Sequence, residues 1–192
     1  MSDNNNEITF RILCSKEELI DILDRKGYKK DRSFVLDDTY FVPVDTDFSE
    51  SARLIISKAI ILRIISEEDK CDKELVYKLK DIDPSGAIKS QKKYTCGIQN
   101  ESDAMEFLQA LGYKKLFRIV ENDIVCEKDG MGLIIKDVVD MGLMMEIETR
   151  KQGPFSSIED LISLVDKLEI PADKSDYFVK KAEIAFNNIN GV

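Results

Sequence analysis

Charged side chains recur at every second residue beside apolar stretches of this chain. Glu146 and Glu148 directly follow the apolar run 143–145, and Lys78 and Lys80 alternate with apolar neighbours. Residues two apart on a β-strand point to the same side, so each pair would present like charges on one face. Carboxylates suit hard divalent cations, whereas ammonium groups bind phosphate oxygens. The spacing therefore fits either an ionic ligand site or an ordinary solvated sheet face.

Arg63 strengthens the first interpretation because it interrupts the strongly apolar run 59–65. An ionised group inside a protein costs several kcal/mol unless partners surround it. Charges that face inward would therefore indicate an ionic ligand. We expect Arg63, Lys78 and Glu146 to converge on a shared aqueous cavity.

Composition limits the chemistry available. The 192 residues, 43% of them hydrophobic, suffice for one domain with a real core. The net charge of -9 argues against a general binder of nucleic acid or acidic membranes, although it leaves room for a local basic pocket. The chain has no histidine, which excludes Ser-His-Asp and Cys-His nucleophile systems and histidine metal ligands. Catalysis would need carboxylates, lysines, tyrosines, a hydroxyl or thiol, or a hard metal ion.

The four cysteines argue against a zinc site, because none forms a CxxC pair. They are Cys14, Cys71, Cys96 and Cys126. The polar segment 1–6 does not have the features of a signal peptide, and no apolar run reaches membrane-spanning length. These features favour a cytoplasmic protein with free thiols.

The periodicity predicts an α+β domain with a mostly antiparallel sheet, large enough to close into a barrel. We expect a disordered start over 1–6 and a single domain over 7–192, with barrel strands to about 150 and C-terminal helices at about 156–188. Predicted strands cover 7–14, 33–42, 59–66, 74–82, 90–98, 114–128, 132–139 and 143–149. Four helices are predicted: the first is capped by Ser15, the second begins at Ser102, the third is capped by Ser157, and the last runs over about 173–188. The segment 53–57 is ambiguous.

Six short motifs occur in an order and spacing that resemble the CYTH superfamily of class IV adenylyl cyclases and thiamine triphosphatases. They are Asp38-Thr39-Tyr40-Phe41, Leu62-Arg63-Ile64-Ile65, Tyr77-Lys78, Leu111-Gly112-Tyr113, Asp140-Met141-Gly142 and Glu146-Ile147-Glu148. The resemblance runs from residue 7 to about 180, where Ser175-Asp176-Tyr177 is similar to the closing segment of the family.

The resemblance implies a closed, eight-stranded antiparallel β-barrel whose interior binds a triphosphate, with flanking helices. By that resemblance the phosphate-binding residues would be Arg63, Lys78, Lys80, Lys93 and Arg11. Glu7, Glu146 and Glu148 would hold Mg²⁺ or Mn²⁺. The expected partner is a small-molecule triphosphate (nucleotide, thiamine triphosphate or tripolyphosphate) or another anionic ligand, with no nucleic acid and no membrane. Hydrolysis and adenylyl-cyclase-type cyclisation both stay open, as do monomer and homodimer.

The chain departs from the family pattern at several positions. The family's first strand carries Glu-x-Glu-x-Lys. In one register Thr9 replaces its second Glu and Arg11 its Lys, whereas in the other Asn5 and Glu7 take the Glu places and Thr9 takes the Lys. Further along, the pattern is broken by a neutral residue and three reversed charges. These positions are Ile65, Glu121, Asp123 and Lys136.

The reversed charges suggest a second hypothesis. If their strands are neighbours, Lys136 could pair with Glu121 and Asp123 inside the protein and replace ligand-binding charges with internal salt bridges. The chain would then be a non-catalytic binder of a phosphorylated ligand, or a barrel that serves as a scaffold. The alternation at Glu146 and Glu148 is also typical of a solvated sheet edge.

Overall fold

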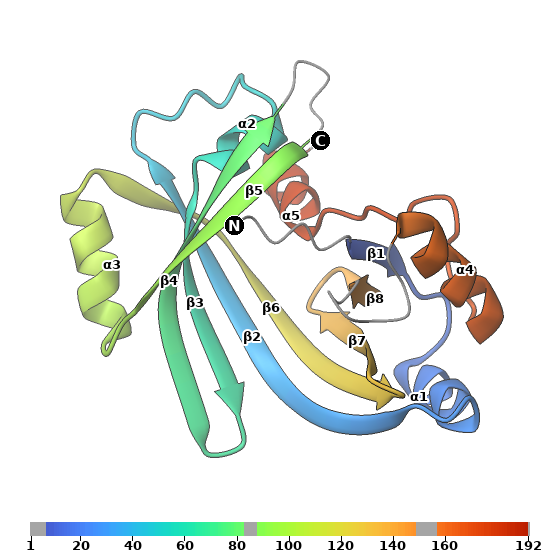
Figure 1. The fold of residues 1–192 in the computed structure, drawn as a ribbon. Helices are drawn as coiled ribbons and strands as arrows, with labels where there is room; N and C mark the ends of the chain where they lie inside the picture. The colour runs from blue at the N-terminus through green and yellow to red at the C-terminus, as the bar shows by residue number, and fades with distance from the viewer. Residues whose placement is uncertain (1–6, 83–87, 149–156, 192) are drawn as a thin grey trace. The chain divides into compact units, whose positions relative to one another are not determined.

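A computed structural model describes residues 7–82, 88–148 and 157–191 (Figure 1). In hydrogen-bonding order the strands form one sheet, β1-β8-β7-β6-β2-β3-β4-β5. The strands are β1 (Glu7–Arg11), β2 (Lys29–Pro43), β3 (Ile60–Glu67), β4 (Lys70–Ile82), β5 (Ile88–Gly97), β6 (Tyr113–Lys128), β7 (Met131–Val138) and β8 (Gly142–Glu148). The helices are α1 (Lys16–Arg25), α2 (Ala52–Ser57), α3 (Glu101–Ala110), α4 (Ile158–Leu168) and α5 (Lys181–Asn190).

The predicted α+β class with an eight-stranded antiparallel sheet is confirmed. The sheet ends at β1 and β5, and within the described ranges no ladder joins these two strands. The hydrogen bonds therefore leave the sheet open, and they do not show the closed barrel that the family resemblance implies. The predicted disordered start over 1–6 lies outside the described residues.

The chain divides into two compact units. Of the described residues, the first unit contains 35–82, 88–120 and 181–191, and the second contains 7–34, 121–148 and 157–180. The long strands β2 and β6 contribute residues to both units. The sequence predicts one domain, and the sheet order is continuous through these two strands.

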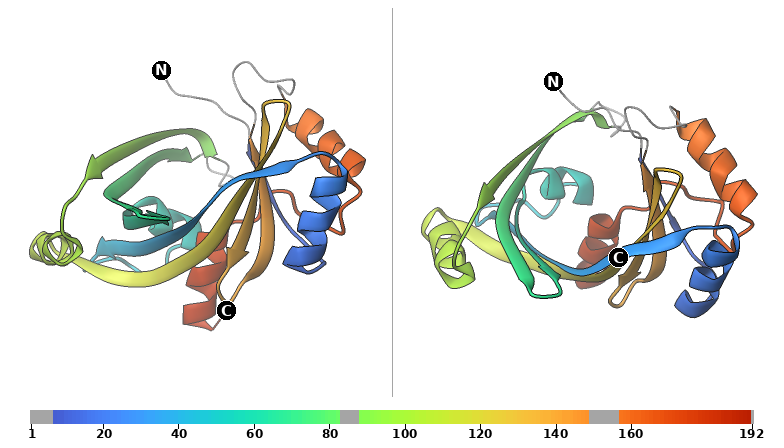
Figure 2. Two further views of the ribbon diagram at one scale, coloured as in Figure 1. Left: turned by 90° about the horizontal axis from the view of Figure 1, so that it is seen from below. Right: turned by 60° about the horizontal axis from the view of Figure 1, so that its bottom comes forward.

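In the second unit, α1 and α4 cover one face of the strands β1, β8 and β7 (Figures 1 and 2). Alternation along β1 sends Ile8 and Phe10 into this core, where both are fully buried. The helices begin where the sequence predicts: the Ser15 hydroxyl accepts from the Glu18 amide, and Ser157 forms a reciprocal capping box with Asp160. Because one face of the strands is apolar, the remaining side chains of β1 and β8 project to the opposite face.

The prediction of a final helix beginning at residue 173 is wrong, because α5 begins at Lys181. The residues before α5 run beside β1 instead. The Thr9 amide donates to the Tyr177 carbonyl, and the Val179 amide donates to the Thr9 carbonyl. These long-range backbone bonds hold the segment extended, and local helix propensity does not reveal them.

In the first unit, α3 packs over Phe41 of β2 and Leu62 of β3 through Ala104 and Leu108. The helix begins earlier than the predicted start at Ser102, because the Asn100 side chain accepts from the Ser102 amide and caps it. The ambiguous segment 53–57 lies in the short helix α2, which contacts α5.

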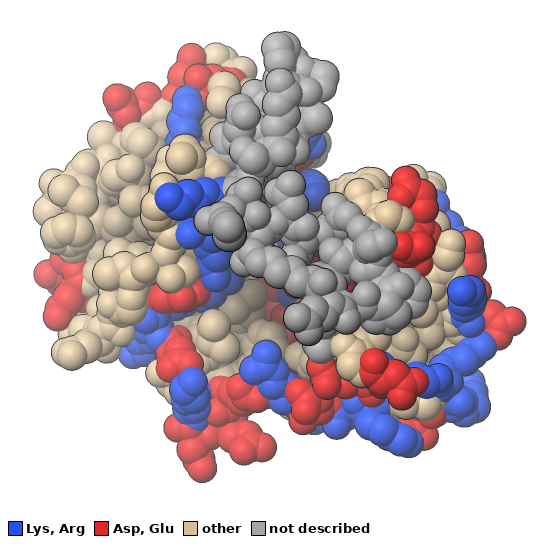
Figure 3. Space-filling model, in the orientation of Figure 1, with Lys and Arg blue, Asp and Glu red and all other residues tan. Residues whose placement is uncertain are grey.

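Lys and Arg are mixed with Asp and Glu over the face drawn in Figure 3, and neither sign covers that face alone. None of the helices in the described ranges combines the length and apolarity that a membrane crossing requires.

Candidate metal centre and basic sheet face

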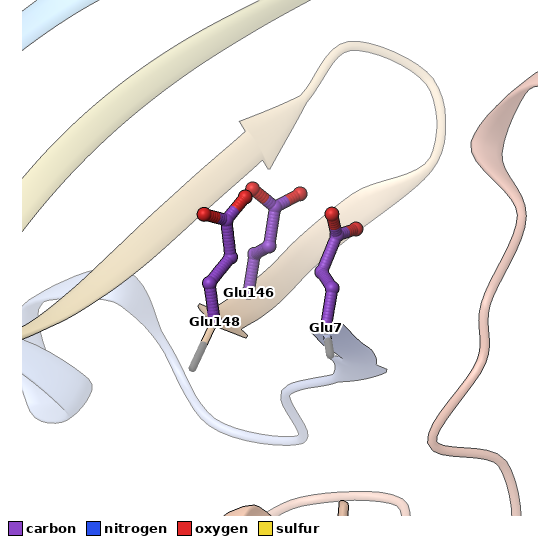
Figure 4. Close-up of side chains that lie close together, drawn as sticks. All are labelled: Glu7, Glu146 and Glu148. Atoms are coloured by element: carbon purple, nitrogen blue, oxygen red, sulfur yellow. The ribbon is translucent and has the colours of Figure 1, made fainter. Parts of the chain in front are cut away.

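Three glutamates of the second unit converge on the face of β1 and β8 that lies opposite the helices. Glu7 and Glu148 are register partners, and Glu146 lies opposite Thr9 two pairs further along, so the three side chains share one face. Each carboxylate offers one oxygen, and the three oxygens lie within 4.8 Å of one another (Figure 4). The apolar alternation of Phe10 and its neighbours fixes this orientation, because those side chains occupy the helix-covered face. The sequence names the same three residues.

The donor set fits a hard divalent cation. Three carboxylate oxygens and no nitrogen or sulfur ligand are what Mg²⁺ and Mn²⁺ prefer. Oxygens bound to Mg²⁺ at about 2.1 Å stand roughly 3–4.2 Å apart, so small side-chain rotations from the observed spacing would suffice. Glu7 and Glu148 are exposed, and Glu146 is largely buried with 15% of its side chain accessible. Their exposure would leave metal positions open to water or a substrate oxygen.

Lys136 lies on the same face of the second unit and is 5% exposed. Its Nζ donates to Asp123 Oδ2 at 2.8 Å and to Glu121 Oε2 at 3.3 Å. The predicted pairing of the reversed charges is therefore present. Burial would lower the pKa of Lys136, but the charges of Glu146, Glu121 and Asp123 outweigh it, so the pKa is raised and the ammonium stays charged.

Arg63 of β3 is held by a carboxylate that the site prediction did not include. Its Nε and Nη2 donate to the two oxygens of Asp38, each at 2.7 Å. The side chains are 16% and 5% exposed. Burial opposes the charge of Arg63, yet the hydrogen bonds and charge of Asp38 outweigh it and raise its pKa. Asp38 is the first residue of the Asp38-Thr39-Tyr40-Phe41 motif and the register partner of Arg63. This motif was therefore the feature of the sequence that could have indicated the ion pair.

Two of the predicted phosphate-binding lysines lie directly opposite each other on neighbouring strands. Lys78 of β4 is the register partner of Lys93 of β5. Like charges in that arrangement repel, and an anion between them would relieve the repulsion. Lys93 Nζ is 3.7 Å from a carboxyl oxygen of Glu74, which partly offsets its charge. Lys80 also lies on β4, but its side chain is outside the described part of the structure.

The other predicted positions divide between the units. Arg11 and Thr9 lie on β1 in the second unit, so the structure groups Arg11 with the acidic residues and not with the lysines of the first unit. Arg11 Nη1 donates to the Met141 carbonyl at 2.9 Å. Thr9 is 6% exposed and its hydroxyl donates to Glu7 Oε1 at 3.4 Å. Ile65 lies in the first unit, opposite Leu36 of β2.

No protein-family model and no curated protein matches the chain. Solved structures do match. The PH1819 protein from Pyrococcus horikoshii OT3 is 20% identical, with a TM-score of 0.66 over 90% of this chain and 95% of that chain. A proposed adenylyl cyclase from Hippeastrum, described as having a dominant triphosphatase activity, is 15% identical, with a TM-score of 0.60 over 95% and 94%. A chain of the Schizosaccharomyces pombe Mediator head module is 8% identical, with a TM-score of 0.53 over 85% and 92%.

These similarities show that the chain shares its fold with these solved structures, because the matches cover nearly the whole of each chain. Identities of 20% and below leave the activity open. The match to a Mediator chain likewise does not identify an activity, since one fold can support unrelated functions. The function of this chain must therefore be argued from its own side chains.

Proposed function

We propose that this chain binds an organic triphosphate together with Mg²⁺ or Mn²⁺ and hydrolyses it slowly. The observation that carries the proposal is the convergence of Glu7, Glu146 and Glu148 on one face of β1 and β8. In the Hippeastrum protein, a chain of similar fold is described as having a dominant triphosphatase activity. That description supports hydrolysis over cyclisation. The family resemblance of the sequence implies that the ligand binds inside a closed barrel.

The chemistry needs no histidine. Phosphoryl transfer depends mainly on positioning and charge neutralisation, which carboxylate-bound metal ions and basic side chains supply. When bound, the divalent cation would neutralise charge on the phosphate oxygens. The proposal assigns its binding to the three glutamates. Phosphate binding by Lys78, Lys80 and Lys93, which lie in the first unit, stays a separate prediction.

Slow turnover is part of the proposal because two of the buried cations are already bound by carboxylates. Arg63 donates to Asp38 from Nε and Nη2, and Lys136 is paired with Asp123 and Glu121. Neither group can neutralise a phosphate at full strength without giving up a buried partner. We expect turnover below the roughly 1–10³ s⁻¹ of ordinary enzymes.

The same observation favours a second candidate function, which is binding of the triphosphate without turnover. One pair of assays separates the two candidates. Thermal unfolding is followed with tripolyphosphate, ATP and thiamine triphosphate, with and without Mn²⁺, and phosphate release is measured on the same samples. A ligand that binds only the native state must raise the melting temperature by mass action.

Stabilisation together with slow phosphate release supports hydrolysis, and stabilisation without release supports the binder. The matched variants are Glu148→Gln, which removes one carboxylate of the proposed metal site, and Glu159→Gln, which neutralises an exposed acid in the first turn of α4. Only Glu148→Gln should lose the Mn²⁺-dependent part of the shift. No stabilisation by any ligand, with or without Mn²⁺, would eliminate both functions.

A further inference from the structure

The Lys136 ammonium lies where the carboxylates of three residues meet. Its Nζ is 2.8 Å from Asp123 Oδ2, 3.3 Å from Glu121 Oε2 and 3.6 Å from Glu146 Oε2. All four side chains are buried or nearly so, with accessible fractions between 1% and 15%. The Lys136 ammonium therefore lies among three carboxylates where water screens their charges little.

The backbone fixes this arrangement. Asp123 of β6 is the register partner of Lys136 on β7, and Lys136 is in turn the partner of Met144 on β8. Glu121 and Glu146 lie two residues from those positions on their own strands, so they share the same face. The four charges consequently come from three adjacent strands of one unit, and no loop movement is needed to assemble them.

Glu146 also belongs to the proposed metal centre. One of its oxygens lies within 4.8 Å of carboxyl oxygens of Glu7 and Glu148, and Oε2 lies 3.6 Å from Lys136 Nζ. The two groups of acids thus form a continuous row in which Glu146 is common to both. A compact cation bound by oxygens from several directions resembles the environment of a metal ion more than an ordinary ion pair.

We propose that the Lys136 ammonium is a built-in cation that fills what would otherwise be a second divalent-metal site, formed by Glu121, Asp123 and Glu146. The proposal rests on the proposed function, in which the neighbouring acids hold the first metal. Lys136 then sets the metal stoichiometry at one ion per chain. It also has no role in phosphate binding, because its hydrogen bonds are directed to carboxylates.

Removal of the ammonium tests this directly. In Lys136→Ala the three carboxylates lose their buried cation while the side-chain volume is vacated. Mn²⁺ would replace the lost positive charge, and the oxygens that now lie 2.8, 3.3 and 3.6 Å from the ammonium nitrogen would move inward by about 0.7–1.5 Å to bind it at about 2.1 Å. We expect Lys136→Ala to bind one more Mn²⁺ per chain than the wild type, as counted by electron paramagnetic resonance of free Mn²⁺.

Thermal unfolding gives the second measurement. At a free Mn²⁺ concentration about 100 times the dissociation constant of the new site, the melting temperature of Lys136→Ala should rise by roughly 5–10 °C more than that of the wild type. The control is Lys16→Ala, which breaks the partly exposed ion pair of Lys16 with Asp137 at 2.6 Å, one residue from Lys136. That variant should keep the wild-type stoichiometry and response to Mn²⁺.

A further variant covers the case in which Lys136→Ala does not fold without metal. Glu121→Gln/Asp123→Asn/Lys136→Met removes both signs of charge at nearly constant volume, so it should fold without metal and bind the same number of Mn²⁺ ions as the wild type. If Lys136→Ala fails to fold even with Mn²⁺ while the neutral variant folds, the site accepts only an ammonium and the proposal is wrong. Equal Mn²⁺ stoichiometry in Lys136→Ala and the wild type refutes it as well.

The test also separates this proposal from the proposed function. If the wild type binds no Mn²⁺, the metal centre proposed at Glu7, Glu146 and Glu148 is refuted. The gain of one ion on removal of Lys136 would still establish the second site. Conversely, if the wild type binds one Mn²⁺ and Lys136→Ala binds no additional Mn²⁺, the proposed function stands and the role proposed for Lys136 is refuted.

Discussion

Two adjacent aspartates of β2 make the same hydrogen bonds in different surroundings, which allows the effect of burial to be measured. Asp38 accepts two bonds at 2.7 Å from Arg63, and the two side chains are 5% and 16% exposed. Asp37 accepts two bonds, at 2.7 and 2.6 Å, from Arg118, and those side chains are 19% and 54% exposed. Both pairs belong to the first unit, and both are bidentate.

A double-mutant cycle should give very different coupling energies for the two pairs. Removal of one partner from a buried pair leaves an uncompensated charge and costs about 3–5 kcal/mol. Asp38→Ala and Arg63→Ala should each approach about 3 kcal/mol, the low end, because part of Arg63 contacts water. The double variant should cost little more than either single variant, which gives a coupling of roughly 2–3 kcal/mol. The exposed pair should couple by only about 0.2–1 kcal/mol.

The assay is equilibrium unfolding in urea of the wild type, the four single variants and the two double variants. A loss of about 3 kcal/mol corresponds to roughly 6–12 °C in melting temperature for a chain of this length. Arg63→Lys is a useful addition, because an ammonium keeps the charge but cannot make the bidentate contact. If the Asp38 pair couples no more strongly than the Asp37 pair, burial does not determine the strength of these ion pairs, and the explanation given for slow turnover fails with it.

Three further predictions concern single positions. Ser157→Ala should remove the cap of α4 and cost about 1 kcal/mol, seen as a fall of roughly 2–4 °C in melting temperature, and an unchanged value would contradict the capping role. Burial raises the pKa of the Cys126 thiol, so at pH 8 Cys126 should react with iodoacetamide only on unfolding. The exposed Cys71 and Cys96 should react in the native state, and mass spectrometry of the labelled peptides measures both reactions. Burial also raises the pKa of Tyr28, so the stability that this neutral phenol provides should be fully present below its ordinary value of 10.0 and be lost as the pH rises through the raised value. Tyr28→Phe should lose less stability than the wild type between pH 10 and 11, and equal losses would contradict the assignment.

The sequence predicts the elements well where the pattern is local. Alternation at Ile8 and Phe10 gives β1 its buried face, and Ser15 and Ser157 mark helix starts that the structure confirms. The pattern fails where distant residues decide the conformation. The residues from 173 to α5 look helical in isolation, yet Thr9 holds them extended through two backbone hydrogen bonds.

The candidate site shows the same division. Glu146 and Glu148 share a face because strand alternation requires it, and the sequence is enough to say so. The pairing of Lys136 with Asp123 could be predicted only on the condition that β6 and β7 are neighbours, a condition that the register meets. The ion pair of Asp38 with Arg63 was not predicted. An aspartate at this position fits both a family motif and an ion pair, and only the position of Arg63 opposite it identifies the ion pair.

Calorimetric titration of Mn²⁺ into the protein saturated with tripolyphosphate tests the central claim most directly. The wild type should bind the ion, and Glu7→Gln/Glu148→Gln should bind it at least about tenfold more weakly, a loss of roughly 1.4 kcal/mol or more. Both substituted side chains are exposed, so the fold should survive. Equal Mn²⁺ affinities in the two proteins would contradict the claim that these glutamates hold the metal.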